Sequence, residues 1–323
     1  MSTADTPGRA PHPASAPAGE KPGIPTRLLV HALVREDGSV DTGELYAVAG
    51  MLGMTDQQVR LCIKRLVAEG RFAHEGRGRK AVLRALADVT GSLAPDVAYV
   101  RHAYRQDQGL APWDGTWHLF AFAIPESRRA ARDALRDALL FLGAAPLQGG
   151  LYVSANPIEE LVEAQARHLG VLGSLTLLTS TDLRVGDLTD PPALAAALWP
   201  LEEIADRYHR LADRAGACRA RLAGPAGAMT GPDAGAAETG RPTEVERLTM
   251  AVELAAEFSR AMEPDPLLPP ELLPQPWPGG RARALTADCW DVLVRSVPEE
   301  DVPRPAPRLF RLYEDVLRTA ISR

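Results

Sequence analysis

Cysteine and long apolar runs are scarce in this sequence. Its 323 residues include three cysteines, Cys62, Cys218 and Cys289, which lie far apart and show neither C-x-x-C nor Cys/His spacing. This usage argues against a zinc site and predicts a reducing, cytoplasmic environment. No apolar run approaches the roughly 20 residues that a helix needs to cross a membrane, so no membrane contact is predicted.

Catalytic motifs are also missing from the chain. Its seven histidines are scattered, with no H-E-x-x-H or paired spacing. There is no nucleophile elbow, catalytic triad or glycine-rich phosphate loop, and Gly76 and Gly78 fit a simple turn. The sequence therefore predicts a protein that is not an enzyme and has neither a cofactor nor a metal site.

Positive charge is concentrated in one stretch of an otherwise acidic chain. The formal net charge is −6, but the segment from Asp56 to Arg84 holds eight lysines and arginines against three acids. A local basic patch on an acidic protein indicates a surface dedicated to phosphate groups.

The same stretch has the pattern of a helix followed by a basic hairpin. Thr55 and Gln58 form a capping box at the start of the helix, and Gly70 follows its end. The apolar face is predicted to contain Val59, Cys62, Ile63, Leu66 and Val67. Short strands are expected at residues 71–74 and 80–84, joined by a turn that carries arginines.

Two further helices are predicted ahead of this one. The first has Thr26 as its N-cap and ends at Gly38, and the second begins at Asp41 with Glu44 completing a box and ends at Gly53. Three short helices and a hairpin predict a winged helix-turn-helix.

In such a unit the polar face of the third helix would read bases. Gln can bond adenine, and Arg or Lys can bond guanine, in the major groove. The residues predicted for this role are Gln57, Gln58, Arg60 and Lys64. Arg65 either contacts DNA or braces the domain. The hairpin residues predicted to contact the DNA backbone are Arg77, Arg79 and Lys80. The alternative for both sets is an ordinary solvated surface.

Arg77→Ala is expected to weaken DNA binding uniformly over sequences and to lower the slope of log affinity against log salt by about one, because one phosphate contact is lost. Titrations of one DNA duplex at several salt concentrations measure that slope. An unchanged slope would contradict the assignment.

Beyond residue 90 the hydrophobic pattern predicts first a region of alternating strands and helices and then a mostly helical region. A connecting helix is expected first, and then a strand at 116–125, a helix at 127–142, a hairpin at 146–154, a helix at 158–169 and a strand at 172–181. That order is typical of a ferredoxin-like split βαβ unit. The rest is helical, at 193–222, 243–262, 280–294 and 308–321. Residues 263–279 are rich in proline and predict a rigid, extended strap anchored by its leucines and Trp277.

The predicted fold class is α+β, with an N-terminal winged helix-turn-helix, a middle ferredoxin-like domain and a helical C-terminal domain that carries the strap. The expected boundaries are a disordered leader at 1–22, the winged helix at 23–90, the connecting helix at 91–111, the ferredoxin-like domain at 112–190 and the helical domain at 191–323, with a flexible loop at 224–241.

Three groups of residues, in this order, resemble the PaaX family of transcriptional repressors of phenylacetate catabolism. The first group is Val59-Arg60, Arg65-Leu66 and Glu69-Gly70, and the second is Trp113-Asp114-Gly115-x-Trp117. The third is the strap, with Asp265-Pro266-Leu267-Leu268-Pro269, Glu271-Leu272-Leu273-Pro274 and Trp277-x-Gly279. The likeness runs from about Ile24 to Arg323 and is most specific in the strap.

The resemblance implies a homodimer that binds a partly palindromic operator in double-stranded DNA and leaves it when a small effector binds, in the best-known relatives an aryl-acetyl coenzyme A thioester. Candidate effector contacts are Trp113, Trp117, Trp277 and Arg281, which could hold the acyl group and phosphates. The alternative is that the tryptophans are core anchors and the arginine is solvated.

Two other functions compete with a DNA-binding repressor. The family's middle domain is similar to a small CRISPR-associated nuclease that carries an Asp at the end of its first strand, and Ala123 stands at that position here. A metal-dependent nuclease would therefore lack a ligand. The second alternative is a winged helix that binds protein rather than DNA.

Overall fold

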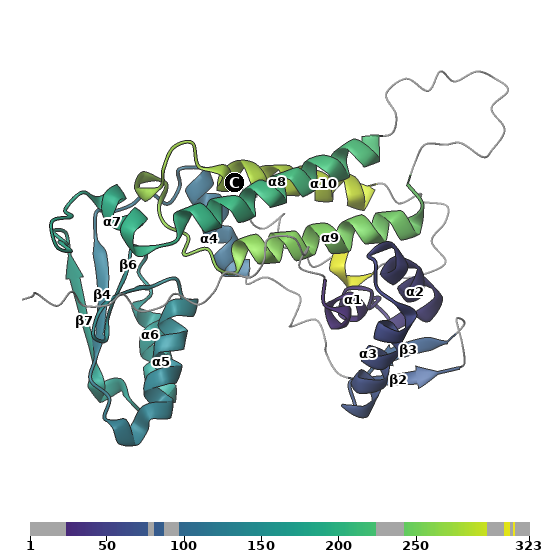
Figure 1. Ribbon diagram of the computed structural model, residues 1–323, viewed down its shortest axis with the longest axis horizontal. Helices are drawn as coiled ribbons and strands as arrows, with labels where there is room; N and C mark the ends of the chain where they lie inside the picture. The colour runs from purple at the N-terminus through teal and green to yellow at the C-terminus, as the bar shows by residue number, and fades with distance from the viewer. Residues whose placement is uncertain are drawn as a thin grey trace, which may run out of the picture.

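The computed structural model describes residues 24–76, 81–86, 97–223, 242–295, 307–310 and 313 (Figure 1). Long helices lie along one side of the molecule, and two smaller units extend from the same side of them. We call these the N-terminal unit, the middle domain and the helical domain. The described residues thus form a mixed α+β protein with two small antiparallel sheets.

The N-terminal unit covers residues 24–76 and 81–86. It contains, in chain order, α1 (Thr26–Ala32), β1 (Ser39–Asp41), α2 (Thr42–Met51), α3 (Asp56–Ala68), β2 (Phe72–Glu75) and β3 (Val82–Ala85). The strands form an antiparallel sheet in the order β1-β3-β2. Leu29, Leu45, Val59, Leu66 and Leu83 pack together in its core.

Several local predictions for this unit were wrong in detail. Thr26 is the first helical residue rather than the cap, and Pro25 in the cap position makes no side-chain hydrogen bond. The helix ends at Ala32, six residues earlier than predicted. The chain then turns at Gly38, where φ is +79°, and enters strand β1, which was not predicted. Val67 is exposed, since it lies at the edge of the face that carries Val59, Ile63 and Leu66.

The middle domain has the predicted order of elements. It contains β4 (Trp117–Phe122), α5 (Arg129–Phe141), β5 (Ala145–Gln148), β6 (Leu151–Ser154), α6 (Glu159–His168) and β7 (Leu175–Ser180). The antiparallel sheet has the order β5-β6-β4-β7, so the apolar strand β4 is central. Phe120 and Tyr152 pack with Leu139 and Val162, which come from the two helices. The predicted end regions at 127–128 and 172–174 are short 3-10 turns instead.

The helical domain contains α7 (Pro191–Leu198), α8 (Leu201–Ala223), α9 (Glu244–Met262) and α10 (Pro278–Arg295), and α4 (Val97–Asp107) lies against it. The prediction of one continuous helix over residues 193–222 was wrong. The residue before a proline avoids the helical conformation, and Trp199, which precedes Pro200, is extended with φ −117° and ψ 147°. Trp199 therefore separates α7 from α8.

The strap between α9 and α10, predicted to be rigid and extended, contains neither an α-helix nor a strand, but a 3-10 turn at Pro270–Leu272 interrupts it. Leu267, Leu268 and Leu272 are buried, and Leu273 and Trp277 are partly buried against the core. The predicted loop at 224–241 and most of the predicted helix at 308–321 lie outside the described residues. Residues 308–310 and 313 are helical.

Candidate nucleic-acid interface

Helix α3 has one buried and one polar face, as the sequence predicts. Thr55 caps the helix by accepting a hydrogen bond from the Gln58 amide, and the Gln58 side chain accepts from the Thr55 amide at 2.8 Å. Val59, Ile63 and Leu66 are buried in the N-terminal unit. The capping box and the apolar spacing therefore fix both the start of the helix and the face that it turns outward.

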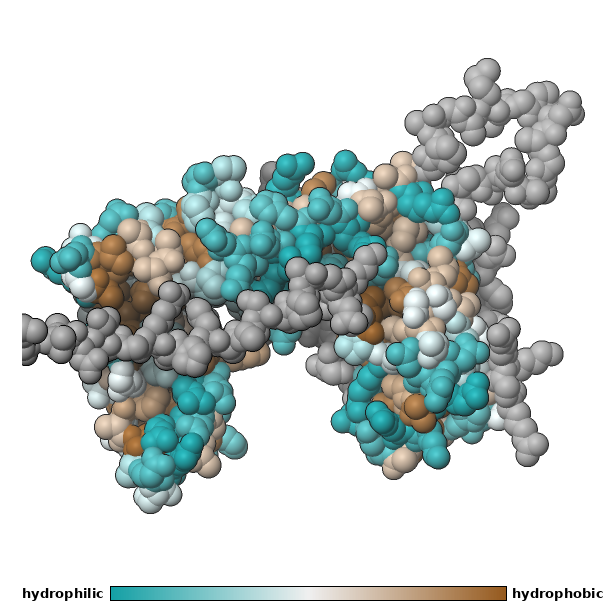
Figure 2. Space-filling view, viewed as in Figure 1, coloured by the Kyte–Doolittle hydropathy of each residue, from teal (hydrophilic) through white to brown (hydrophobic). Residues whose placement is uncertain are grey.

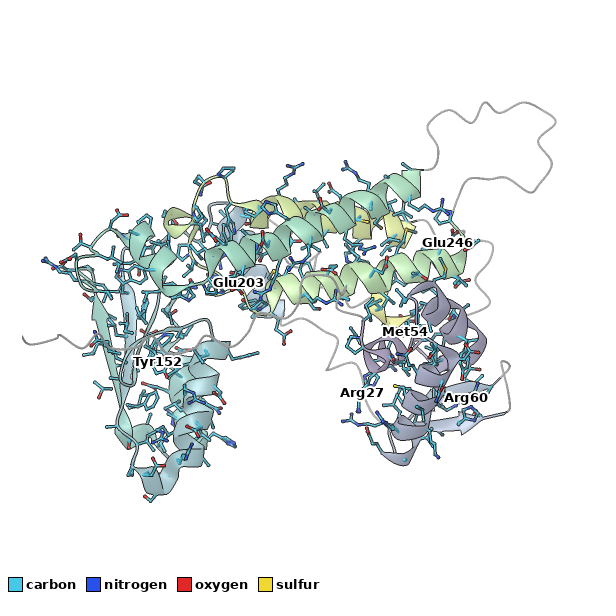
Figure 3. The ribbon with its side chains drawn as sticks, in the orientation of Figure 1. Arg27, Met54, Arg60, Tyr152, Glu203 and Glu246 are labelled. Carbon is cyan, nitrogen blue, oxygen red and sulfur yellow. The ribbon has the colours of Figure 1, made fainter. Side chains whose placement is uncertain are left out.

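The outward face of α3 carries three of the predicted base-reading residues in one row. Gln57, Arg60 and Lys64 are exposed and lie three and four residues apart, which places them on one stripe of a helix. Leu61, which is 48% exposed, lies beside this stripe. Arg60 stands on the side of the unit that carries the β2-β3 hairpin (Figure 3). We call Gln57, Arg60 and Lys64 the α3 stripe, and Leu61 is its apolar neighbour.

Two other predicted contacts, Gln58 and Arg65, are not part of this stripe. Gln58 is exposed, but its side-chain oxygen already accepts hydrogen bonds from the amide and hydroxyl of Thr55. It would have to release the cap to bond adenine through both polar atoms. Arg65 is exposed and follows Lys64 by one residue, so it flanks the stripe.

The hairpin beside α3 is only partly described. The antiparallel pairing aligns Phe72 with Ala85 and Glu75 with Val82, and Arg84 pairs with Glu75 at 3.3 Å on the surface. Arg77, Arg79 and Lys80 lie outside the described residues. Figure 2 shows a mostly hydrophilic surface at the end of the N-terminal unit that points away from the long helices.

The proposed effector residues fall into two groups. Trp117 is 1% exposed and lies between Trp113, at 5.1 Å between ring centroids, and Trp199, at 6.3 Å. Trp277 contacts Tyr208 edge to face at 6.3 Å, and Arg281 is exposed near the start of α10. Trp117 thus acts as a core residue, while Trp113, Trp277 and Arg281 keep some exposure.

A buried polar centre joins the strap to the helices, and sequence reasoning missed it. It consists of Tyr208 on α8, Asp265 in the strap and Arg283 on α10, which are buried, and of Asp107 on α4, which lies at its edge with a side chain that is 21% exposed. Arg283 donates two hydrogen bonds to the Asp107 carboxylate, at 2.7 and 2.6 Å, and one to the Tyr208 hydroxyl at 2.6 Å. Tyr208 in turn donates to Asp265.

The charges of this centre depend on one another. Burial alone would lower the pKa of the Arg283 guanidinium, but Tyr208, Asp107 and Asp265 reverse that effect and raise it. Burial raises the pKa of Asp265, although Arg283, the Tyr208 hydroxyl and the Leu267 amide act in the opposite direction. Removing any one member would leave buried polar atoms without partners.

The strap also holds the middle domain. Leu267 has a left-handed backbone, with φ +50°, and its amide donates to Asp265 at 2.8 Å. Its carbonyl accepts from Gln106 on α4 at 2.8 Å and from Asn156, which follows β6, at 2.9 Å. These hydrogen bonds hold a conformation that a leucine rarely adopts.

Within the described ranges, no three His, Cys, Asp or Glu side chains are grouped so that they could hold a metal ion. None of the described helices is both long and apolar enough to cross a membrane.

Models of known protein families match two of the three regions of the chain, the middle domain and the helical domain. The family model "PaaX protein central Cas2-like domain" matches residues 110–194, and "PaaX-like protein C-terminal domain" matches residues 199–297. The chain belongs to the PaaX family. The family contains transcriptional regulators. In this PaaX-family protein the Cas2-like match covers the sheet β5-β6-β4-β7, and the C-terminal match covers α8, α9, the strap and α10.

Two further comparisons say less about this PaaX-family protein. Among solved structures, the uncharacterized protein Rv0674 from Mycobacterium tuberculosis is 22% identical, with a TM-score of 0.41. The alignment covers 78% of this chain and 87% of that one. Among curated proteins, no significant match was found.

Proposed function

We propose that this PaaX-family protein is a DNA-binding transcriptional repressor that acts as a cytoplasmic homodimer. The N-terminal unit has the helices and the hairpin of a winged helix-turn-helix, with α3 as its recognition helix. The observation that carries the proposal is the α3 stripe, which turns polar and basic side chains outward from a helix whose other face is fixed in the core.

Within this proposal the residues divide by role. Gln57, Arg60 and Lys64 read base edges, and Leu61 contacts thymine methyl groups. Gln58 holds the start of the helix, and Arg65 reaches the neighbouring backbone. Arg77, Arg79 and Lys80 of the hairpin contact phosphates, which adds affinity and salt dependence rather than sequence choice.

The release step rests on family membership. We propose that a small effector, in the manner of the family an acyl-coenzyme A thioester, lowers operator affinity in the dimer. The nuclease alternative is not favoured, because Ala123 has no side chain that could bind a metal.

Arg60→Ala is expected to weaken binding to the operator by about 5- to 150-fold, because a good contact between a side chain and a base contributes about 1–3 kcal/mol. The measurement is an electrophoretic mobility shift with DNA from upstream of the protein's own gene, at two salt concentrations. Arg210→Ala, an exposed arginine on α8 far from the α3 stripe in sequence, is the matched control and should bind as the unaltered protein does.

Three outcomes of that experiment separate the candidate functions. Salt-dependent binding that Arg60→Ala weakens and Arg210→Ala leaves intact supports the repressor. Loss of intact DNA only in the presence of a divalent metal would support the nuclease. No binding to the upstream region at either salt concentration would contradict the proposal and favour a protein-binding winged helix.

A further inference from the structure

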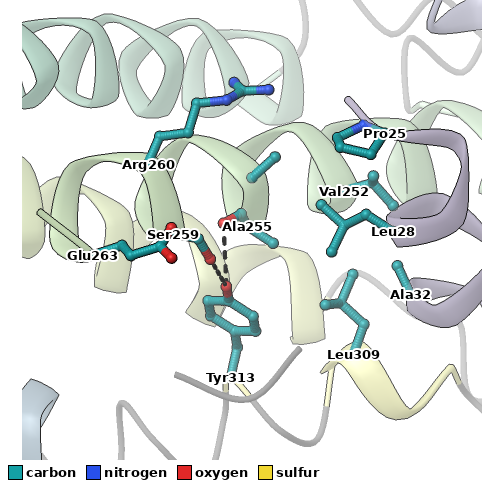
Figure 4. Close-up of a pocket in the computed structure, with 11 residues that line it drawn as sticks. Pro25, Leu28, Ala32, Val252, Ala255, Ser259, Arg260, Glu263, Leu309 and Tyr313 are labelled. Carbon is teal, nitrogen blue, oxygen red and sulfur yellow. Dashed lines mark hydrogen bonds between the residues drawn. The ribbon is translucent and has the colours of Figure 1, made fainter. Parts of the chain in front are cut away.

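A cavity of about 270 Å³ lies where the N-terminal unit meets the helical domain (Figure 4). Leu28 and Ala32 of α1 form one wall, and Val252 and Ala255 of α9 form the opposite wall. Leu309, from the C-terminal segment, closes a third side. The walls therefore come from three segments that are distant in sequence, and all five of these side chains are apolar.

The cavity has the size of a ring with a short substituent. Ligand pockets for drug-sized molecules have volumes of about 300–1,000 Å³. An apolar cavity of roughly 150 Å³ is already large enough for benzene. The observed volume of about 270 Å³ lies between the two, which favours one ring with a small polar group.

The polar end of the cavity is built from hydroxyl groups. Tyr313 donates a hydrogen bond to the Ala255 carbonyl at 3.2 Å, and the Ser259 hydroxyl lies 3.4 Å from the Tyr313 hydroxyl. Burial raises the pKa of Tyr313 to about 12, so its hydroxyl keeps its proton at neutral pH. Ser259 and Tyr313 can therefore bond a hydroxyl or carbonyl group of a ligand.

The charged groups at the cavity leave one carboxylate in excess. Arg260 lines the cavity but is paired with Glu257 at 2.5 Å, and Glu263 adds a second carboxylate on the same side. An excess carboxylate repels an anion, so the site suits an uncharged ligand better than an anion.

The cavity also lies where the two units are tied together. The Arg308 amide donates to the Val34 carbonyl at 2.8 Å, which attaches the C-terminal segment to the N-terminal unit. Five residues further on, Tyr313 stacks on Trp290 of α10 at 4.7 Å. A ligand that contacts α1, α9 and Leu309 would therefore change how the C-terminal segment connects the N-terminal unit to the helical domain.

We propose that this cavity binds a small uncharged molecule, a ring with one hydroxyl or carbonyl group, and that its occupancy changes how the N-terminal unit is held and so lowers operator affinity. This inference rests on the proposed function for its consequence, but ligand binding itself does not. An acyl thioester could place only its acyl group here, with the coenzyme outside.

The test uses acetophenone and 2-phenylethanol as uncharged probes and benzoate as the charged comparison. Calorimetry on the full chain without DNA should give Kd values of about 0.1–1 mM for the uncharged probes, as expected for so few atoms. Benzoate should bind at least tenfold more weakly.

Two variants fill the cavity from opposite walls. Ala255→Leu on α9 and Ala32→Leu on α1 should each weaken the uncharged probes at least tenfold, because the added side chain enters the empty volume. Ala284→Leu, at an exposed site of α10, should leave Kd unchanged. Helical circular dichroism checks that each variant folds. If one cavity variant fails to fold, the other decides the result.

The outcomes keep this inference apart from the proposed function. Saturable probe binding that both cavity variants abolish, together with release of the operator by the same probe, supports it. No probe binding, equal binding by the variants, or benzoate binding as tight as acetophenone would overturn the site, whatever the DNA result. Probe binding with unchanged operator affinity would overturn the coupling between the cavity and DNA binding. If the probe lowers the affinity for DNA, DNA must lower the affinity for the probe by the same factor. Absence of DNA binding would contradict the proposed repressor function but would not affect the conclusion that the cavity binds the probe.

Discussion

Replacing Arg283 by methionine should lower the free energy of unfolding by about 3–5 kcal/mol, the usual cost of removing one partner of a buried ion pair. Methionine keeps most of the apolar volume of the side chain but provides no donors. The two hydrogen bonds to Asp107 and the one to Tyr208 would be lost. Asp265, which is 7% exposed, would lose the cation 3.7 Å away.

Arg295→Met is the matched control on the same helix. Arg295 also pairs with a carboxylate, Asp291, at 2.9 Å, but its side chain is 77% exposed. Water solvates both partners there, so the loss should stay below about 0.5 kcal/mol. Urea unfolding followed by tryptophan fluorescence compares the two variants. Equal midpoints for Arg283→Met and Arg295→Met would show that the buried polar centre does not hold the helices together.

Gly143→Ala should destabilise the junction of the middle domain by about 2–5 kcal/mol. Gly143 follows α5 with φ +85°, which costs a residue with a side chain roughly 1–2 kcal/mol. A Cβ atom there would lie 2.8 Å from the Cα atom of Pro266 in the strap, and the backbone would have to move at a further cost of about 1–3 kcal/mol. The Gly143 carbonyl also accepts from the Trp199 indole at 2.9 Å, so that movement would disturb α7 as well.

Gly109→Ala is the control that separates the conformational cost of a positive φ from the cost of the clash with the strap. Gly109 ends α4 in the same way that Gly143 ends α5, with φ +70° and the same pair of backbone hydrogen bonds to the last turn. No atom lies within 4 Å of the position that a Cβ atom would take there, so only the conformational cost should appear. Thermal unfolding followed by circular dichroism should therefore give a lower melting temperature for Gly143→Ala than for Gly109→Ala. The reverse order, or equal losses, would contradict the close approach of the strap.

Sequence reasoning was most successful where neighbours in sequence decide the structure. The capping box of Thr55 and Gln58, the buried spacing of Val59, Ile63 and Leu66, and a strand within residues 116–125 were all predicted and are confirmed. The central position of that strand in the sheet was not predicted. It failed at β1, because a three-residue strand has too short a pattern to recognise and forms only by pairing with β3. It also missed the break at Trp199, although Pro200 was a visible local signal.

The candidate site was predicted unevenly for the same reason. The polar face of α3 follows from helical periodicity, so the sequence could place Gln57, Arg60 and Lys64 together on that face. The engagement of Gln58 in the cap was visible too, since the box itself was predicted, yet its effect on base contact was missed. The cavity left no signal, because its walls come from α1, α9 and residue 309, and no local pattern connects them.

The sequence by itself determined the order of the elements in the middle domain, the outward face of α3 and the absence of a helix in the proline-rich strap, since each depends on residues within a few positions of one another. Only the tertiary structure decided which polar residues are buried. Arg281 and Arg283 lie two positions apart on one helix, yet one is exposed and the other is enclosed by Asp107, which is 176 residues away. Burial and pairing depend on contacts across the whole chain, so residues of the same type in the same helix acquire opposite roles.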